Sequence, residues 1–312
     1  MSKLKALLLT EGLHGMISQT EGLAKALDFD YIHEKIELNS FWKFIPTSFT
    51  PIKKFVFKNK IDRDFDIIIS CGRKSIIPSL FLKKNSKKKI INIHIQNPKI
   101  ALKHFDFIVC PEHDSLEGPN VLSTKGAIHY LTNEEINNSK DYLLNKLEKD
   151  KDIITLILGG PNKYYKYTDE NMIKIFSTIN QKIKEHKLQV VVIPSNRTPK
   201  KTIELSKGYF TDSRIIVDTV DKSAYLSSLA LAKYIVVTCD STSMISEAAL
   251  TGKPVYVAMI PALRNDKRFE RFRNLFEKLN IVKKLDNKLE TWNYEKLNEA
   301  GRIASEIKQK IN

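Results

Sequence analysis

The sequence predicts an α/β protein built from two Rossmann-like domains. Short apolar runs rich in β-branched residues recur along both halves, as in strands that are buried on both faces of a parallel sheet. Polar loops follow several of these runs and lead into segments of helical periodicity, the pattern of repeated β-α-β units. The 312 residues exceed one ordinary core. We expect an N-terminal domain at 1–145 and a C-terminal domain at 146–312, linked by a polar helical segment at 133–148.

Composition narrows the kinds of partner. The chain has 51 Lys and Arg against 36 Asp and Glu, which gives a net charge of +15. This charge favours an anionic partner, such as nucleotide phosphates or an anionic membrane. The alternative is that the charge serves only solubility. No recognised nucleic-acid motif accompanies this charge, so nucleic acid is not expected. No apolar run reaches transmembrane length. Cys71, Cys110 and Cys239 are widely spaced and lack metal-ligand spacing, which indicates reduced thiols, a cytoplasmic protein and no metal site.

The first domain opens with a strand at 4–9, a glycine-containing turn at 10–15 and a helix at 18–27. This is the opening of a Rossmann-like domain, but the turn lacks the G-x-G-x-x-G pattern, so we predict no NAD site. Further strands are expected at 65–70, 90–96 and 105–110, with a helix at 76–82. Polar loops leave the carboxyl ends of these strands, where open α/β sheets bind ligands.

The segment 39–60 differs in composition from its surroundings. It interleaves six aromatic residues with five lysines: Phe41, Trp42, Phe44, Phe49, Phe55 and Phe57, and Lys43, Lys53, Lys54, Lys58 and Lys60. Aromatic rings among lysines are typical of a surface that binds an anionic membrane. The alternative is a helical hairpin that packs its rings on the domain and leaves its lysines in solvent.

The second domain is expected to alternate strands and helices. Strands are predicted at 153–158, 189–193, 214–217, 235–237 and near 255–257, and helices at 170–186, 224–232, 269–279 and 294–311. The last two helices are amphipathic and are expected to close this domain.

Two loops of the second domain carry candidate phosphate ligands. Gly159 and Gly160 directly follow its first strand, and Ser195 and Arg197 follow its second. Arginine binds phosphate through paired N–H groups. The alternative for Arg197 is an ordinary surface position, because the Thr-Pro pair after it is a good helix start.

The stretch 234–260 carries the strongest site pattern: strand, polar turn, short helix, Gly-Lys-Pro turn and strand. Asp240, Ser241 and Ser243 are each candidate caps of the helix. A helix that starts at the carboxyl end of a parallel strand attracts phosphate through its unpaired N–H groups and its dipole.

The same short helix adds two candidate ligand residues. Met244 lies on its apolar side, and Glu247 lies one turn beyond the cap, where a carboxylate can accept two ribose hydroxyls while a diphosphate lies on the helix end. The alternative is that the hydroxyls only cap the helix and Glu247 is solvated.

Eight motifs, in order along most of the chain, carry a family resemblance. They are TEGLHGMISQTEGLAKAL at 10–27, IHIQNPK at 93–99, FDFIVCPEHD at 105–114, GPNVLSTKGAIHYLT at 118–132, LILGGPNKYY at 156–165, PSNRTP at 194–199, VTCDSTSMISEAALTGKPVYV at 237–257 and WNY at 292–294. The chain resembles the family of the plant mitochondrial fission factor "elongated mitochondria", which has many bacterial relatives. It departs from the family pattern in the first loop and at Asn196, where the family tends to have arginine.

The resemblance implies the glycosyltransferase architecture called GT-B, with two Rossmann-like domains facing a cleft. In that architecture the C-terminal domain binds a nucleotide-diphosphate sugar as substrate and the N-terminal domain binds the acceptor. The diphosphate is then expected on the helix start at 241–243, assisted by Arg197 and the backbone of Gly159 and Gly160. Glu247 would hold the ribose, and neither a metal nor a separate cofactor is required.

A general base is expected from the acceptor side of this arrangement. His14 is the first candidate and Asp114 the second, because each follows a strand of the first sheet. The alternative for His14 is a structural role in the turn.

The leading hypothesis is a metal-independent GT-B-type glycosyltransferase, cytoplasmic and peripheral at the inner face of a membrane. A nucleotide-sugar epimerase on the same fold is one alternative, with the same nucleotide site and other acid–base residues. Because plant members of the family are implicated in recruiting a dynamin-related protein, a non-catalytic adaptor with a protein partner is another.

Overall fold

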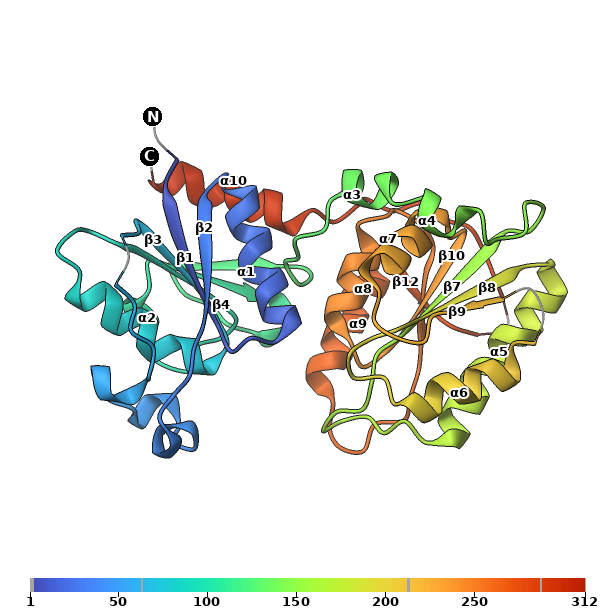
Figure 1. Ribbon diagram of the computed structural model, residues 1–312, viewed down its shortest axis with the longest axis horizontal. Coiled ribbons are helices and arrows are strands. Elements are labelled where there is room, and N and C mark those ends of the chain that lie inside the picture. Colours follow the sequence, from blue (N-terminus) through green and yellow to red (C-terminus); the bar gives the residue numbers. More distant parts are fainter. Residues whose placement is uncertain (1–2, 63, 212–213, 287, 312) are drawn as a thin grey trace. The chain divides into compact units, whose positions relative to one another are not determined.

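The computed structural model describes residues 3–62, 64–211, 214–286 and 288–311, which form two compact units (Figure 1). The first unit comprises Met1–Tyr130 together with Asn298–Asn312, and the second comprises Leu131–Leu297. The α/β class with two Rossmann-like units is confirmed. The predicted boundary at 145/146 is wrong, however, as is the assignment of the whole C-terminus to the second domain, because the last helix buries its apolar side against the first sheet.

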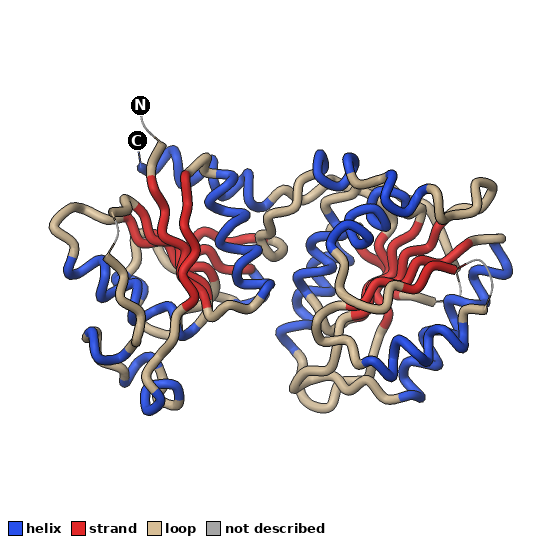
Figure 2. Tube along the Cα trace, viewed as in Figure 1, coloured by secondary structure: helices blue, strands red, loops and turns tan. Residues whose placement is uncertain are grey.

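The first unit contains a six-stranded sheet within the described ranges, and its strands pair in parallel (Figure 2). The strands are β1 (Lys5–Thr10), β2 (Asp30–Lys35), β3 (Ile67–Cys71), β4 (Ile91–Ile95), β5 (Phe107–Pro111) and β6 (Val121–Thr124), in the order β2-β1-β3-β4-β5-β6. Inner strands such as β3 are continuous buried runs because both sheet faces are covered. The edge strand β2 has no such run, which explains why its sequence did not predict it.

Three α-helices in the described part of the first unit cover the two faces of this sheet. They are α1 (His14–Ala26), α2 (Arg73–Asn85) and α10 (Glu299–Ile311). Alternate residues of a strand face opposite sides, so Leu8 packs with α1 and α10, whereas Leu7 packs with α2. The C-terminal helix α10, red in Figure 1, lies beside α1 and contributes Ile303, Ala304 and Ile307 to the core of the first unit.

The segment between β2 and β3 forms short 3-10 turns and not a helical hairpin. They are η1 (Ser40–Lys43), η2 (Thr47–Phe49) and η3 (Lys54–Val56). Two further 3-10 turns, η4 (Leu102–His104) and η5 (Glu112–Asp114), flank β5.

The second unit contains another parallel sheet, six-stranded in its described part (Figure 2). The strands are β7 (Ile153–Leu158), β8 (Gln189–Pro194), β9 (Arg214–Ile216), β10 (Tyr234–Thr238), β11 (Val255–Ala258) and β12 (Val282–Lys284), in the order β12-β11-β10-β7-β8-β9. The central strands β7, β8 and β10 are buried along their whole length, as their apolar runs predict.

The helices of the second unit include the segment that the sequence assigned to a linker. They are α3 (Asn133–Asn138), α4 (Asp141–Leu144), α5 (Asp169–His186), α6 (Lys200–Tyr209), α7 (Lys222–Leu231), α8 (Thr242–Ala249) and α9 (Lys267–Lys278). The segment at 133–148 belongs to this unit because Leu143 of α4 is buried with Ile153 and Ala224. Within the described ranges, every helix is too short or too polar to span a bilayer.

Candidate functional site

The second sheet reverses its strand order between β7 and β10. From β7 the chain adds β8 and β9 on one side, then crosses over and adds β10, β11 and β12 on the other. Open α/β sheets bind ligands outside the carboxyl ends of their strands at such a reversal. The loops that leave β7, β8 and β10 meet at this edge, and together with helix α8, which follows β10, they carry the predicted nucleotide-binding residues.

The buried carboxylate of Asp240 connects these loops. Its Oδ2 accepts hydrogen bonds from the N–H of Gly160 at 3.0 Å and from the guanidinium of Arg197 at 2.9 Å. Its Oδ1 accepts the O–H of Tyr167 at 2.7 Å. Burial, with the Asp240 charge next, raises the pKa of Tyr167 well above its ordinary value, so Tyr167 stays a neutral donor. Three donors therefore satisfy the buried charge.

The Gly159–Gly160 loop is packed closely against its neighbours. The N–H of Gly159 donates to Thr238 Oγ1 at 2.8 Å, and the Ser195 hydroxyl donates to the Gly159 carbonyl at 2.8 Å. A Cβ on Gly159 would collide with Asp240, and a Cβ on Gly160 would collide with the backbone of the β8 loop. Both N–H groups that we expected to assist a diphosphate have protein acceptors, so α8 and Arg197 are the better candidates.

Arg197 is held by two loops and still faces solvent. Its Nη1 donates to the Gly160 carbonyl at 2.8 Å, and its Nη2 donates to Asp240. The Arg197 side chain is 43% exposed. Because a guanidinium has more N–H groups than these contacts use, Arg197 combines a fixed position with donors that remain open to an anion.

The short helix α8 starts at the same edge of the sheet. Ser241 is its N-cap and accepts the Met244 N–H at 3.4 Å, which confirms one of the three predicted caps. Thr242, Ser243 and Met244 in the first turn are half-exposed. First-turn N–H groups lack intrahelical acceptors and lie at the positive end of the helix dipole, so an anion is favoured here.

Glu247 lies on the buried side of α8, so the alternative of a solvated Glu247 is wrong. It is 9% exposed, and the Tyr225 O–H of α7 donates to its Oε2 at 2.6 Å. Tyr225 is the one hydrogen-bond partner of the Glu247 carboxyl group in the part of the chain that the structure describes. Burial raises the pKa of Glu247 to about 7, and the Tyr225 hydrogen bond opposes part of this rise. Its Oε1 therefore remains available to a further donor.

The first sheet has its own strand reversal, between β1 and β3. There Glu11 reaches the start of α2, where its Oε1 accepts the Lys74 N–H at 3.1 Å and its Oε2 pairs with Lys74 Nζ at 2.8 Å. The anion position at this helix start is filled by a carboxylate of the protein itself. The start of α2 is thus occupied by Glu11, whereas the start of α8 carries no such carboxylate contact among the described hydrogen bonds, so an external phosphate is favoured in the second unit.

His14 and Asp114 lie in the first unit on separate strand ends. His14 is the exposed first residue of α1 and not a turn residue, and its ring meets Tyr130 edge-on with centroids 6.1 Å apart. The Asp114 side chain is 12% exposed and lies 3.9 Å from His113 Nε2. Two strands separate β1 from β5, a spacing of roughly 14 Å. The two candidate residues therefore do not form a pair.

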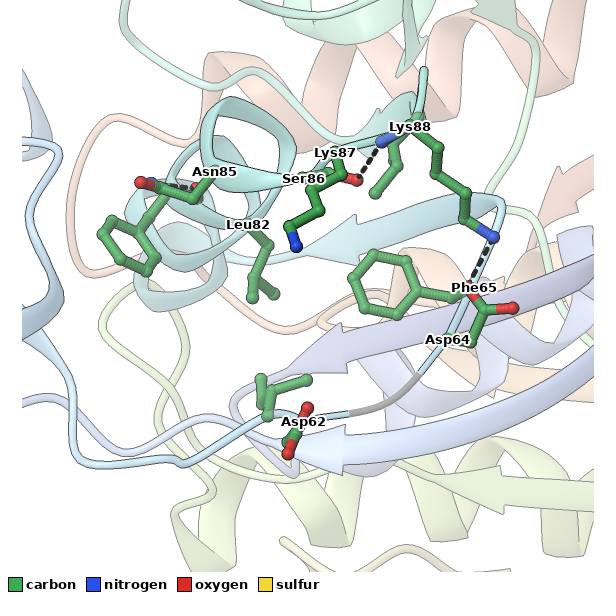
Figure 3. Close-up of a pocket in the computed structure, with 11 residues that line it drawn as sticks. Asp62, Asp64, Phe65, Leu82, Asn85, Ser86, Lys87 and Lys88 are labelled. Carbon is green, nitrogen blue, oxygen red and sulfur yellow. Dashed lines mark hydrogen bonds and ion pairs between the residues drawn. The ribbon is translucent and has the colours of Figure 1, made fainter.

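A cavity of about 420 Å³ lies in the first unit beside the amino ends of the strands, opposite the carboxyl ends described above (Figure 3). Phe65, Leu82 and Ile90 line its apolar part, and Lys88 pairs with Asp64 at 2.6 Å on its rim. Because the cavity lies near the amino ends of β3 and β4, it is remote from the candidate bases His14 and Asp114, which follow the carboxyl ends of β1 and β5.

Sequence reasoning missed Tyr167, Tyr225, Thr238 and Glu11. The two tyrosines carry no periodic or motif signal, because their hydroxyl partners come from other parts of the chain. Thr238 has a weak signal as the last residue of β10, and Glu11 has one as the first residue after β1.

The fold defines a class: this is an α/β protein of two Rossmann-like units, and its candidate site lies in the second unit. The model of the family described as "Mitochondrial fission ELM1" matches residues 14–311, so the chain belongs to this family. It is 28% identical over 295 residues to the uncharacterized protein RP120 of Rickettsia prowazekii, covering 82% of this chain and 83% of that protein. It is 23% identical over 281 residues to mitochondrial fission protein ELM1 of Arabidopsis thaliana, covering 78% of this chain and 64% of that protein.

Several solved structures share this fold, and two of those described below are UDP-GlcNAc 2-epimerases by name. UDP-GlcNAc 2-epimerase from Neisseria meningitidis, bound to UDP-GlcNAc, aligns with a TM-score of 0.55 at 12% identity and covers 99% of both chains. The Methanocaldococcus jannaschii 2-epimerase aligns at 0.54 and 15% identity over 98% of this chain and 100% of that one. Acinetobacter baumannii MurG aligns at 0.50 and 10% identity over 99% and 90%. These likenesses confirm the GT-B-type fold.

Proposed function

We propose that the protein binds a nucleotide-diphosphate sugar at the carboxyl edge of its second sheet and transfers the sugar without a metal ion. The observation that carries the proposal is the meeting of Arg197, Asp240 and the start of α8 at the strand reversal. The bound UDP-GlcNAc in the Neisseria meningitidis epimerase supports the ligand class. Cytoplasmic location is part of the proposal, and the three buried free cysteines support it.

In this proposal the diphosphate lies between the first turn of α8 and the exposed side of Arg197. Because Asp240 and the Gly160 carbonyl already hold the guanidinium, little side-chain entropy is lost when an anion binds. As the bond between sugar and phosphate breaks, negative charge grows on the leaving diphosphate. Fixed donors stabilise this charge without reorganisation. The ribose hydroxyls donate to Glu247, whose Oε2 is oriented by Tyr225.

The general base in this proposal comes from the first unit. His14 is preferred over Asp114 because it is exposed, whereas the Asp114 side chain is largely buried. His14→Ala should lower turnover and leave nucleotide affinity unchanged. Unchanged turnover would transfer the role to Asp114 or remove the transferase hypothesis.

The first experiment is a thermal-shift screen of nucleoside diphosphates and their sugars, since a ligand of the folded state must raise apparent stability. Titration calorimetry then compares the parent with Glu247→Ala, which should bind the best ligand weaker by about 1.5–3 kcal/mol. Glu270→Ala, an exposed carboxylate on α9, is the matched control and should bind normally. Equal affinity of Glu247→Ala and the parent would reject the ribose assignment.

Two other functions share parts of this site. A nucleotide-sugar epimerase, favoured by the named neighbours, would convert the sugar nucleotide with no acceptor present. An adaptor, favoured by the name of the Arabidopsis thaliana relative, would show no thermal shift with any nucleotide. Proton NMR of the protein with sugar nucleotide alone, and then with candidate acceptors, separates these cases.

A further inference from the structure

We propose that the aromatic surface, defined as the exposed rings of Phe41, Phe44, Phe49 and Phe55, docks on a lipid bilayer of negative charge. These side chains are 66%, 85%, 77% and 58% exposed, the largest such group on the first unit. Isolated exposed apolar residues are ordinary, but several rings from one short segment mark a contact surface. This inference is independent of the nucleotide site.

The segment that carries the rings is well ordered. The Arg73 guanidinium, at the start of α2, donates to the Ile45 carbonyl at 2.8 Å and to the Lys43 carbonyl at 2.5 Å. The Asn39 amide donates to the Phe55 carbonyl at 2.5 Å. The rings are therefore exposed because of the fixed backbone of the 3-10 turns, and not because the segment lacks packing.

The six aromatic residues of the segment divide between the two sides. Phe57 is buried against Phe81 of α2, and Trp42 is half-buried on the same core, while the other four rings are exposed. The packed-hairpin alternative required all of the rings to face inward, and the structure contradicts it for these four. Exposing four rings to water is unfavourable unless another apolar phase receives them.

The positive charge of the segment 39–60 indicates that the partner of the aromatic surface is an anionic bilayer. Lys43, Lys53, Lys54, Lys58 and Lys60 are all exposed, and the segment 39–60 has no Asp or Glu. None of the five forms an ion pair with a described residue. Lys54 Nζ donates to the carbonyls of Phe57 at 3.3 Å and Asn59 at 2.7 Å, but these acceptors are neutral. A bilayer offers an anion for the lysines and an apolar layer for the rings together, because lipid phosphates meet the lysines while the rings enter the layer beneath. A protein partner would need an apolar surface and an acidic surface matched to four separate rings.

Co-sedimentation with phosphatidylcholine vesicles, with or without phosphatidylserine, tests the proposal on the full chain. The parent should bind only the anionic vesicles, and binding should fall as salt rises. The triple variant Phe41→Ser, Phe44→Ser and Phe49→Ser should partition at least about tenfold less. These positions are exposed, so the core should keep its structure. Leu263→Ser, which removes an exposed apolar side chain of the second unit, is the matched control.

Two double substitutions of lysine distinguish binding through the aromatic surface from general electrostatic attraction between the basic chain and the vesicles. Lys43→Glu with Lys53→Glu should abolish binding, whereas Lys84→Glu with Lys89→Glu changes the net charge equally at exposed sites outside the segment 39–60 and should retain most of the binding. In a Trp292→Phe background, Trp42 emission should shift to the blue on binding, because Trp42 packs against Phe41 and Phe55.

The proposal fails if the protein stays in the supernatant with anionic vesicles at low salt, or if both lysine pairs weaken binding equally. It also fails if the ring variant instead converts a dimer to a monomer by light scattering while vesicles bind neither protein. That last result would make the aromatic surface a contact between copies of the chain.

Discussion

Replacing Glu247 with glutamine should change how the stability of the second unit depends on pH. Burial raises the pKa of this carboxyl from 4.5 to about 7 in the folded protein. The unfolded chain loses its proton first as pH rises, so the free energy of unfolding decreases between pH 4.5 and 7. One pKa unit corresponds to about 1.4 kcal/mol, and the full loss above pH 7 is therefore about 3 kcal/mol.

Glutamine is nearly isosteric, carries no charge, and can still accept the Tyr225 hydroxyl. Glu247→Gln should match the parent near pH 4.5 and exceed its stability by up to about 3 kcal/mol at pH 8. The measurement is urea unfolding from pH 4.5 to 8, monitored by Trp292, which packs on Tyr256 in the second unit. A Trp42→Phe background removes the signal of the first unit.

Glu270→Gln is the control, since Glu270 is exposed on α9 and its replacement should leave the pH profile of the parent unchanged. Parallel losses of stability in the parent and Glu247→Gln across this pH range would refute the raised pKa of Glu247. That result would mean that the ionised carboxylate is solvated. It would also count against the proposal that Glu247 binds the ribose in a buried site.

Three further outcomes follow from the packing. Tyr167→Phe should destabilise the second unit by about 1–3 kcal/mol in urea unfolding, because it removes a donor from the buried Asp240 carboxylate; no loss would mean that water replaces the hydroxyl. Gly22→Ala should lower the melting temperature of the first unit, since a Cβ there would collide with the His129 carbonyl, and an unchanged value would contradict this packing. The Cys239 thiol, whose pKa burial raises to about 11, should react with a thiol reagent only on unfolding, and rapid labelling of the native protein at pH 8 would contradict its burial.

The sequence predicted the elements whose signals are local. β7 was predicted with its observed bounds because its six residues are all apolar or β-branched and buried, and Ser241 was among the predicted caps because a hydroxyl before a short helix is a local pattern. β2 was not predicted, since an edge strand needs no continuous apolar run.

The parts of the site that depend on distant contacts were not predictable. Asp240 was one of three candidate helix caps, but the fold uses it to bind Tyr167 and the backbone of Gly160 from the loop after β7, and Arg197 from the loop after β8. Glu247 was placed in the site by its spacing along α8, yet the hydrogen bond that its carboxyl group accepts comes from Tyr225 of another helix. A single sequence carries no signal for such pairings across the sheet.

The return of α10 to the first unit sets the order in which the protein can be completed during its synthesis. Residues 131–297, the whole second unit, leave the ribosome before α10 does. Until then, the apolar side of α1 and the sheet beneath it lack the cover of Ile303, Ala304 and Ile307. The unit that is translated first is therefore finished last. A nascent chain that stops after Leu297 would contain a complete second unit and an N-terminal unit whose core is open. Chaperones bind apolar surface of this kind.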